Sequence, residues 1–183
     1  MTSGSHHDFI DLIAEQNKLF LHTVNAFNII HGKKALQKIL YFVDLDYHRF
    51  SYRWDKFGPF SPQLNYLFDD AVADYLLSVE KEELSPGINQ FNMSLSNSGI
   101  EFVRKNKLSP EVDSKIKYVH NFLNGETARK MELLASVHKI INDYKTKDTK
   151  SILKMIKSLK PKSGFTSQEV SVSINKLKEN SYI

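Results

Sequence analysis

The run from residue 34 to residue 67 constrains the fold of this chain more than any other segment. Its first half places apolar residues at helical spacing, which predicts a buried helix. The expected inward residues are Leu36, Ile39, Leu40, Val43 and Tyr47. Residues 52–57 then alternate with a period near two, which is typical of a short strand. Gly58-Pro59 is expected to end that strand, and Ser61-Pro62 supplies an N-cap and first residue for a further helix.

The same run resembles a known family. Its LQKILYF segment and the FGPFSPQL segment are similar to the core of the YwgA-like proteins and of the related SocA-like (Panacea-type) antitoxin domains. The matching positions are Leu36, Gln37, Lys38, Leu40, Tyr41, Phe42, Phe57, Gly58, Pro59, Ser61, Pro62 and Leu64, with Phe57 standing where the related pattern usually has tyrosine. Residues 159–183 extend the likeness to YwgA-like proteins. The resemblance implies no catalytic residue, and the antitoxin domains imply binding to a partner protein.

Residues 8–107 predict a winged-helix-like domain. The expected elements around the central run are helices at 8–27 and 62–74 and strands at 76–81 and 91–95, joined by a Ser-Pro-Gly turn. Ser96 is the expected N-cap of a further helix, in which Gly99 allows another segment to approach closely. This junction resembles the end of a wing, where the second strand enters a helix.

Residues 108–183 predict a helical domain with a basic tail, packed on the first domain. Ser109-Pro110 begins one helix, and Thr166 with Glu169 forms a capping box for the last. The fold class is therefore mainly α with a small β hairpin or three-stranded wing, in which a winged-helix-like N-terminal part packs with a C-terminal helical part.

The charge is unevenly distributed along the 183 residues. From Lys145 onward there are nine lysines and three acidic residues, a net charge of +6, whereas the preceding residues sum to −2. Such asymmetry indicates either a surface for nucleic acid or acidic protein, or a solvated face of lysine-rich helices. The chain has no cysteine, which fits a reducing compartment, and no apolar run of membrane-spanning length. We therefore expect a cytoplasmic protein without a membrane partner.

The helix that would read DNA in a winged helix is poorly suited to that task. The helix at 62–74 contains no lysine or arginine, and it contains Asp69, Asp70 and Asp74. Carboxylates oppose binding to phosphates, so this surface favours a protein partner. The expected partner-binding residues are these three aspartates together with the aromatic anchors Tyr52, Trp54 and Phe60.

Nucleic-acid binding is a second hypothesis, because lysines gather in other segments. The candidate residues are Lys33, Lys34 and Lys38 on the central helix and Lys154, Lys157, Lys160 and Lys162 in the tail. On this alternative the protein is a transcriptional regulator or a defence-system component that uses its lysine-rich C-terminal part.

No motif indicates an enzyme, a cofactor or a metal. The sequence lacks the G-x-S-x-G, phosphate-loop, dinucleotide and H-E-x-x-H patterns. Asp44 and His48 lie four apart in the expected central helix, but a metal site needs three or four converging ligands. His138 is expected to be a partly buried, hydrogen-bonded side chain. The sequence therefore predicts a non-enzymatic interaction module that binds and restrains a partner protein, such as a toxin.

Overall fold

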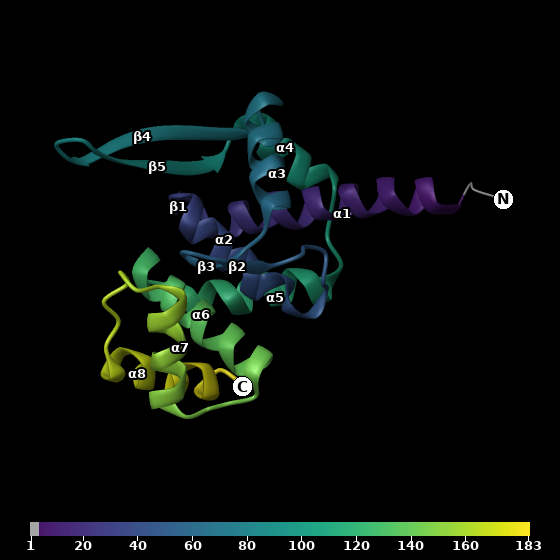
Figure 1. Ribbon diagram of the computed structural model, residues 1–183. Helices are drawn as coiled ribbons and strands as arrows, with labels where there is room; N and C mark the ends of the chain where they lie inside the picture. The colour runs from purple at the N-terminus through teal and green to yellow at the C-terminus, as the bar shows by residue number, and fades with distance from the viewer. Residues whose placement is uncertain (1–3) are drawn as a thin grey trace.

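The computed structural model describes the backbone of residues 4–183 and the side chains of residues 10–87 and 89–183. In chain order the elements are α1 (Gly4–Phe27), β1 (Ile30–His31), α2 (Lys33–Val43), the 3₁₀ helix η1 (Asp44–Asp46), β2 (Arg53–Asp55), β3 (Gly58–Phe60), α3 (Pro62–Ala73), β4 (Leu77–Ser85), β5 (Ile88–Leu95), α4 (Asn97–Lys105), α5 (Pro110–Leu123), α6 (Ala128–Tyr144), α7 (Thr149–Leu159) and α8 (Ser167–Glu179) (Figure 1). The expected fold, mainly α with a small β part, is confirmed.

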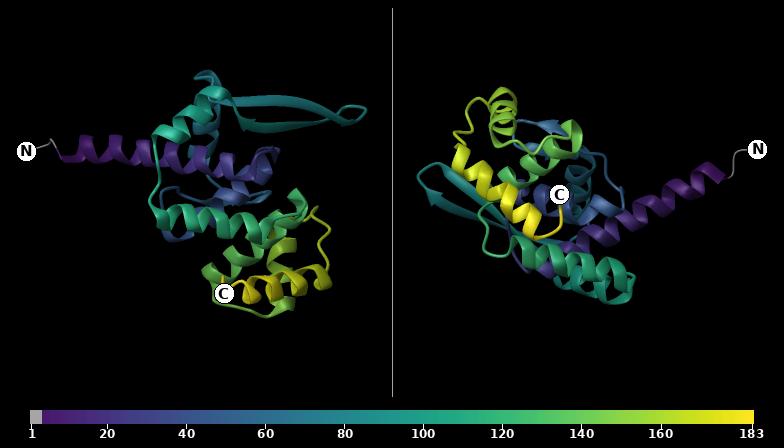
Figure 2. Two further views of the ribbon diagram at one scale, coloured as in Figure 1. Left: turned by 180° about the vertical axis from the view of Figure 1, so that it is seen from behind. Right: turned by 90° about the horizontal axis from the view of Figure 1, so that it is seen from below.

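The wing is an antiparallel sheet in the order β1-β5-β4. Its long β4–β5 hairpin extends away from the helices in both side views (Figures 1 and 2). The third strand is β1, in which Ile30 pairs with Met93. The sequence analysis missed β1, because two residues are too few to show an alternating pattern. With α1, α2 and α3, these strands complete the winged-helix order.

The strand expected at residues 52–57 is present as the shorter β2, which pairs with β3 in a two-stranded ribbon outside the wing sheet. Trp54 pairs with Pro59, and the chain reverses at Lys56-Phe57. The expectation that Gly58-Pro59 ends the strand was wrong, because these residues begin β3. Gly58 has φ +89°, and β3 packs against α2 and α6.

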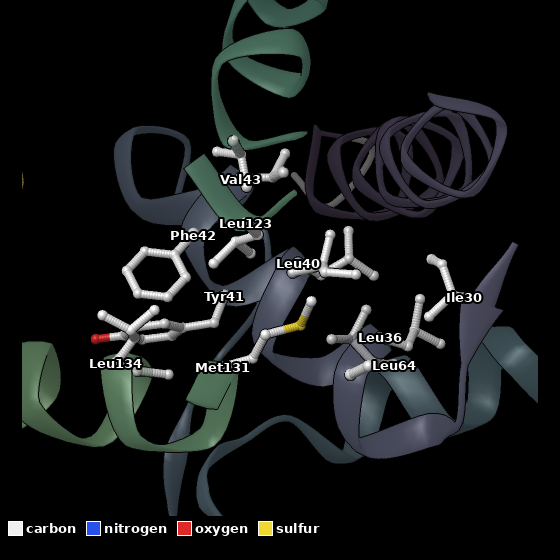
Figure 3. Close-up of a cluster of buried hydrophobic side chains, with 14 of the residues drawn as sticks. Ile30, Leu36, Leu40, Tyr41, Phe42, Val43, Leu64, Leu123, Met131 and Leu134 are labelled. Carbon is white, nitrogen blue, oxygen red and sulfur yellow. The ribbon is translucent and has the colours of Figure 1, made fainter. Parts of the chain in front are cut away.

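The central helix α2 is almost wholly buried, from Ala35 to Val43. It packs against α1, α5 and α6, and Figure 3 shows its side chains near Leu123 of α5 and near Met131 and Leu134 of α6. The helix ends earlier than expected, so Tyr47 lies outside it. The Asp44 carboxylate accepts hydrogen bonds from the backbone N–H groups of Arg49 and Phe50, both at 2.9 Å, which turns the chain away from the helix axis.

The junction of the wing and α4 follows the expected capping geometry. The Ser96 hydroxyl accepts a hydrogen bond from the Gly99 N–H at 3.1 Å. A Cβ atom on Gly99 would lie 2.2 Å from the Leu76 carbonyl oxygen, so the close approach predicted at this glycine is present.

Helices α5 to α8 begin at side-chain caps. Ser109, Thr127, Asp148 and Thr166 each accept a hydrogen bond from the N–H three residues on, and Thr166 with Glu169 forms the expected capping box. One continuous hydrophobic core includes residues from both parts of the chain. Helices α5 and α6 pack on α2, while α7 and α8 pack on α6 and on each other.

Helix α1 is the longest helix that the structure describes, at 24 residues. Its first turns project beyond the other elements (Figures 1 and 2), and Ile10 and Leu12 are exposed there. Within residues 4–183, no helix combines the length and apolar character that crossing a membrane requires.

Candidate functional site

Helix α3 turns its apolar side inward and its acidic side outward. Its buried residues are Leu64, Leu67, Phe68 and Ala71. The intervening positions place Asp69 and Asp70 on the exposed side, and exposed Asp74 follows as the C-cap. Asp69 is partly neutralised by Lys33, whose Nζ lies 3.0 Å from the Asp69 Oδ1.

The wing extends the acidic character of α3. Between residues 61 and 99 there are six acidic residues and one lysine, Lys81. Three of the acids, Glu80, Glu82 and Glu83, are exposed on β4, which packs against α3. We call α3, Asp74, Tyr75 and the β4–β5 hairpin the α3–wing surface. Its charge would repel a nucleic-acid backbone and attract a basic protein.

Two tyrosines that the sequence analysis did not select lie on the α3–wing surface. Tyr66 on α3 is 70% exposed, and Tyr75, between α3 and β4, is 79% exposed. Tyrosine is enriched among the residues that dominate protein interfaces, so these are suitable anchors. The helical phase of α3 could have identified Tyr66, because it lies off the stripe that includes Leu64, Leu67 and Phe68.

The predicted aromatic anchors lie elsewhere and contribute to packing. Tyr52 was wrongly expected to be exposed: its ring packs edge-on against Tyr41, and its hydroxyl is buried. The half-buried Trp54 donates its indole N–H to the Asp143 carboxylate at 3.0 Å, and Phe60 is also half-buried. These residues hold the β2–β3 ribbon against the helices.

The predicted nucleic-acid residues do not form one surface. Lys38 and Lys160 are only 1% and 4% exposed, so the expectation that they contact nucleic acid was wrong. Both point inward because buried acceptors hold their ammonium groups. Lys33 is paired with Asp69, and the Nζ of Lys34 lies 3.4 Å from the centroid of the Phe57 ring.

The other predicted lysines are exposed at the end of the molecule away from the wing. Lys154 and Lys157 lie on α7, and Lys162 follows that helix (Figure 1). Lys150, also exposed, is at helical spacing from Lys154 and Lys157, so the three form a stripe along α7. The acidic and basic surfaces are therefore on different elements.

A buried charged cluster lies between α2, α6, α7 and the β2–β3 ribbon. The Lys160 Nζ donates to the Glu132 carboxylate at 2.7 Å and to the Ser136 hydroxyl at 2.9 Å. The Lys38 Nζ donates to the Pro59 carbonyl at 2.5 Å. Burial, with a further contribution from the charge of Lys160, lowers the pKa of Lys38 to about 8. Burial also lowers the pKa of Lys160, although Glu132 opposes this change.

His138 is more deeply buried than expected, at 2% exposure, and it is hydrogen-bonded. Its Nδ1 lies 2.8 Å from the Tyr41 hydroxyl, and the rings of Phe42 and Tyr182 pack around it. Burial lowers the pKa of His138 to about 4, so the imidazole is neutral at physiological pH. It is a core residue with a satisfied polar atom.

Asp44 and His48 are not placed as the helical spacing predicted. The helix ends at Val43, and His48 has φ +52°, so the pair does not share a helical face. The Asp44 carboxylate is already used by two backbone N–H groups. Among the described side chains, no three His, Asp or Glu residues are grouped as metal ligands would be.

Comparisons with known proteins returned no relative: neither the protein-family models nor the curated proteins gave a match to this chain.

Proposed function

We propose that this protein is a non-enzymatic interaction module, resembling the YwgA-like and SocA-like antitoxin domains, that binds and restrains a basic partner protein in the cytoplasm. The α3–wing surface is the binding surface. A toxin is one such partner, in keeping with the resemblance of residues 36–64 to the antitoxin domains.

The observation that best supports this proposal is the combination of charge and exposed aromatic residues on α3. Asp69, Asp70 and Asp74 are exposed beside Tyr66 and Tyr75, which have no apolar cover. Exposed tyrosines supply apolar contact area, while the carboxylates attract a basic partner and orient it. The glutamates on β4 extend the same charge along the hairpin.

Reversal of the three α3 charges is expected to abolish partner capture. The variant is Asp69→Lys, Asp70→Lys and Asp74→Lys in one chain, used as bait in nuclease-treated host lysate. We expect at least a tenfold loss of the captured partner, because three attractive contacts become repulsive. Quantitative mass spectrometry of the bound fraction, followed by affinity measurement with the purified partner, gives the result.

The matched control reverses three exposed acids outside the α3–wing surface: Glu101→Lys, Glu111→Lys and Glu179→Lys. This control changes the net charge as much as the aspartate variant does, and it should capture as much of the partner as the unaltered chain. Equal capture by both variants and the unaltered chain would contradict the assignment of this surface. The double variant Tyr66→Ala and Tyr75→Ala should also lose binding, because aromatic anchors dominate interface energies.

Nucleic-acid binding remains a second candidate, supported by the exposed stripe of Lys150, Lys154 and Lys157 on α7. On this alternative, the variant Lys154→Glu with Lys157→Glu should lose duplex binding, and binding by the unaltered chain should fall steeply with salt. Fluorescence anisotropy with a labelled duplex measures both effects. Salt-insensitive or absent binding would eliminate the candidate. Truncation at Lys145 is unsuitable, because α7 and α8 contribute Ile152 and Val170 to the core.

A further inference from the structure

A cavity of about 250 Å³ lies where α2, α3 and the β2–β3 ribbon meet. Lys34, Lys38 and Asp55 line it together with Phe57 and Phe60. Drug-sized ligands generally occupy pockets of roughly 300 Å³ or more, so this cavity has room for a smaller molecule.

The cavity has a fixed floor. The Gln37 side chain donates to the Ser61 carbonyl and accepts from the Ser61 N–H, each at 2.9 Å. This pair of hydrogen bonds joins α2 to the end of the ribbon beside Lys38. The polar floor is therefore held in place before any ligand arrives, which reduces the entropy lost on binding.

Lys38 has unused hydrogen-bonding capacity at this floor. Its ammonium group has three protons, and within residues 4–183 the Pro59 carbonyl is the single acceptor placed on it. The residue is only 1% exposed although it lines this cavity, so few water molecules can reach the other protons. A buried donor that lacks acceptors is destabilised, and an acceptor entering the cavity would remove that cost.

The surroundings of Lys38 are also short of negative charge. Lys160 lies close enough to lower the pKa of Lys38, and Lys34 acts in the same direction. Glu132, whose carboxylate pairs with Lys160 at 2.7 Å, and Asp55, which is exposed at the ribbon, act in the opposite direction, so three lysines face two acids. An anion in the cavity would therefore be drawn to Lys38 and Lys34, which both line it.

We propose that this cavity binds a small molecule with one phosphate or carboxylate group, which contacts the Lys38 and Lys34 ammonium groups while Phe57 and Phe60 contact its apolar part. The burial of Lys38 favours a small free anion over a nucleic-acid backbone, whose phosphates cannot reach an amine beneath the surface. The site adjoins the α3–wing surface, because Asn65 of α3 and Lys33, which pairs with Asp69, also line the cavity.

Inorganic phosphate and benzoate are the probes, each titrated at pH 7 against sodium chloride of equal ionic strength. We expect a saturable rise in Tm and a saturable heat of binding with at least one anion, at a Kd of about 1 mM or below. The preferred probe distinguishes a phosphate site from a carboxylate site. No saturable response to either anion would overturn the proposal.

Single substitutions test whether the anion binds in this cavity. Lys38→Met should weaken the response at least tenfold and Lys34→Ala severalfold, while Lys107→Ala, at an exposed position between α4 and α5, should match the unaltered chain. If Lys38→Met does not fold, NMR of the unaltered chain decides: shifts at the Lys34, Lys38, Phe57, Gly58 and Phe60 amides support the site. Shifts confined to the α7 lysines, or a folded Lys38→Met that binds normally, would overturn it.

Discussion

Substituting alanine for Gly99 is expected to lower the free energy of unfolding by about 3 kcal/mol or more. The added Cβ would lie 2.2 Å from the Leu76 carbonyl oxygen and 3.2 Å from the Leu95 Cδ2 atom. The backbone oxygen cannot move freely, because it accepts a hydrogen bond from the Ser96 N–H at 3.0 Å. Relief of the clash must therefore separate α4 from the start of the wing. Urea denaturation followed by circular dichroism measures the loss.

The direction in which Gly99→Ala changes the free energy of unfolding distinguishes an effect of packing from one of helix propensity. Gly99 lies in the first turn of α4 without a positive φ, so propensity alone favours alanine there by up to about 1 kcal/mol. The control is Ser98→Ala, one residue earlier at an exposed position, where a change within about 0.5 kcal/mol is expected. A stabilised or unchanged Gly99→Ala variant would show that the close contact does not constrain the junction.

The sequence predicted elements well where the periodic pattern was long and local caps reinforced it. The α2 stripe is a repeat within one helix, and the Ser96 cap and the Thr166 capping box rest on contacts three residues apart, so sequence spacing alone identifies all three. Two features depend on distant partners instead: strand β1 is defined by pairing with β5, and the ribbon by packing on α6. The end of α2 depends on Asp44 accepting from the N–H groups of Arg49 and Phe50, five and six residues on, which no periodic pattern indicates.

The same distinction explains which site residues were predicted. The acidic side of α3 follows from its helical phase, so Asp69, Asp70 and Asp74 are exposed as expected. Lys38 and Lys160 were assigned to the surface because lysine is usually exposed. Their acceptors, Pro59 and Glu132, come from segments distant in sequence, and no spacing rule indicates that such partners will be present.

Glu132→Gln is expected to destabilise the protein by about 3–5 kcal/mol, because it leaves buried ammonium charge without a counterion. The Lys160–Glu132 pair has side-chain exposures of 2% and 13%, which places it among buried ion pairs. Lys160→Met alone should be less damaging, since it removes the repulsion between Lys160 and Lys38. The double variant Glu132→Gln with Lys160→Met should be more stable than Glu132→Gln alone. The unaltered protein, the two single variants and the double variant form a cycle that gives the coupling energy between the two side chains.

The pH dependence of the free energy of unfolding tests whether the destabilisation of Glu132→Gln is electrostatic. The folded-state pKa of Lys38, about 8, is below its unfolded value of 10.5. Between these values the unfolded chain binds more protons, so the free energy of unfolding rises with pH. Without Glu132, Lys38 and Lys160 should release protons more readily, and the loss of stability in Glu132→Gln should shrink between pH 8 and 10.

The control is Asp113→Asn, at an exposed ion pair with Lys117, which should change the free energy of unfolding by at most about 1 kcal/mol. A Glu132→Gln deficit that is constant across this pH range would instead indicate lost packing.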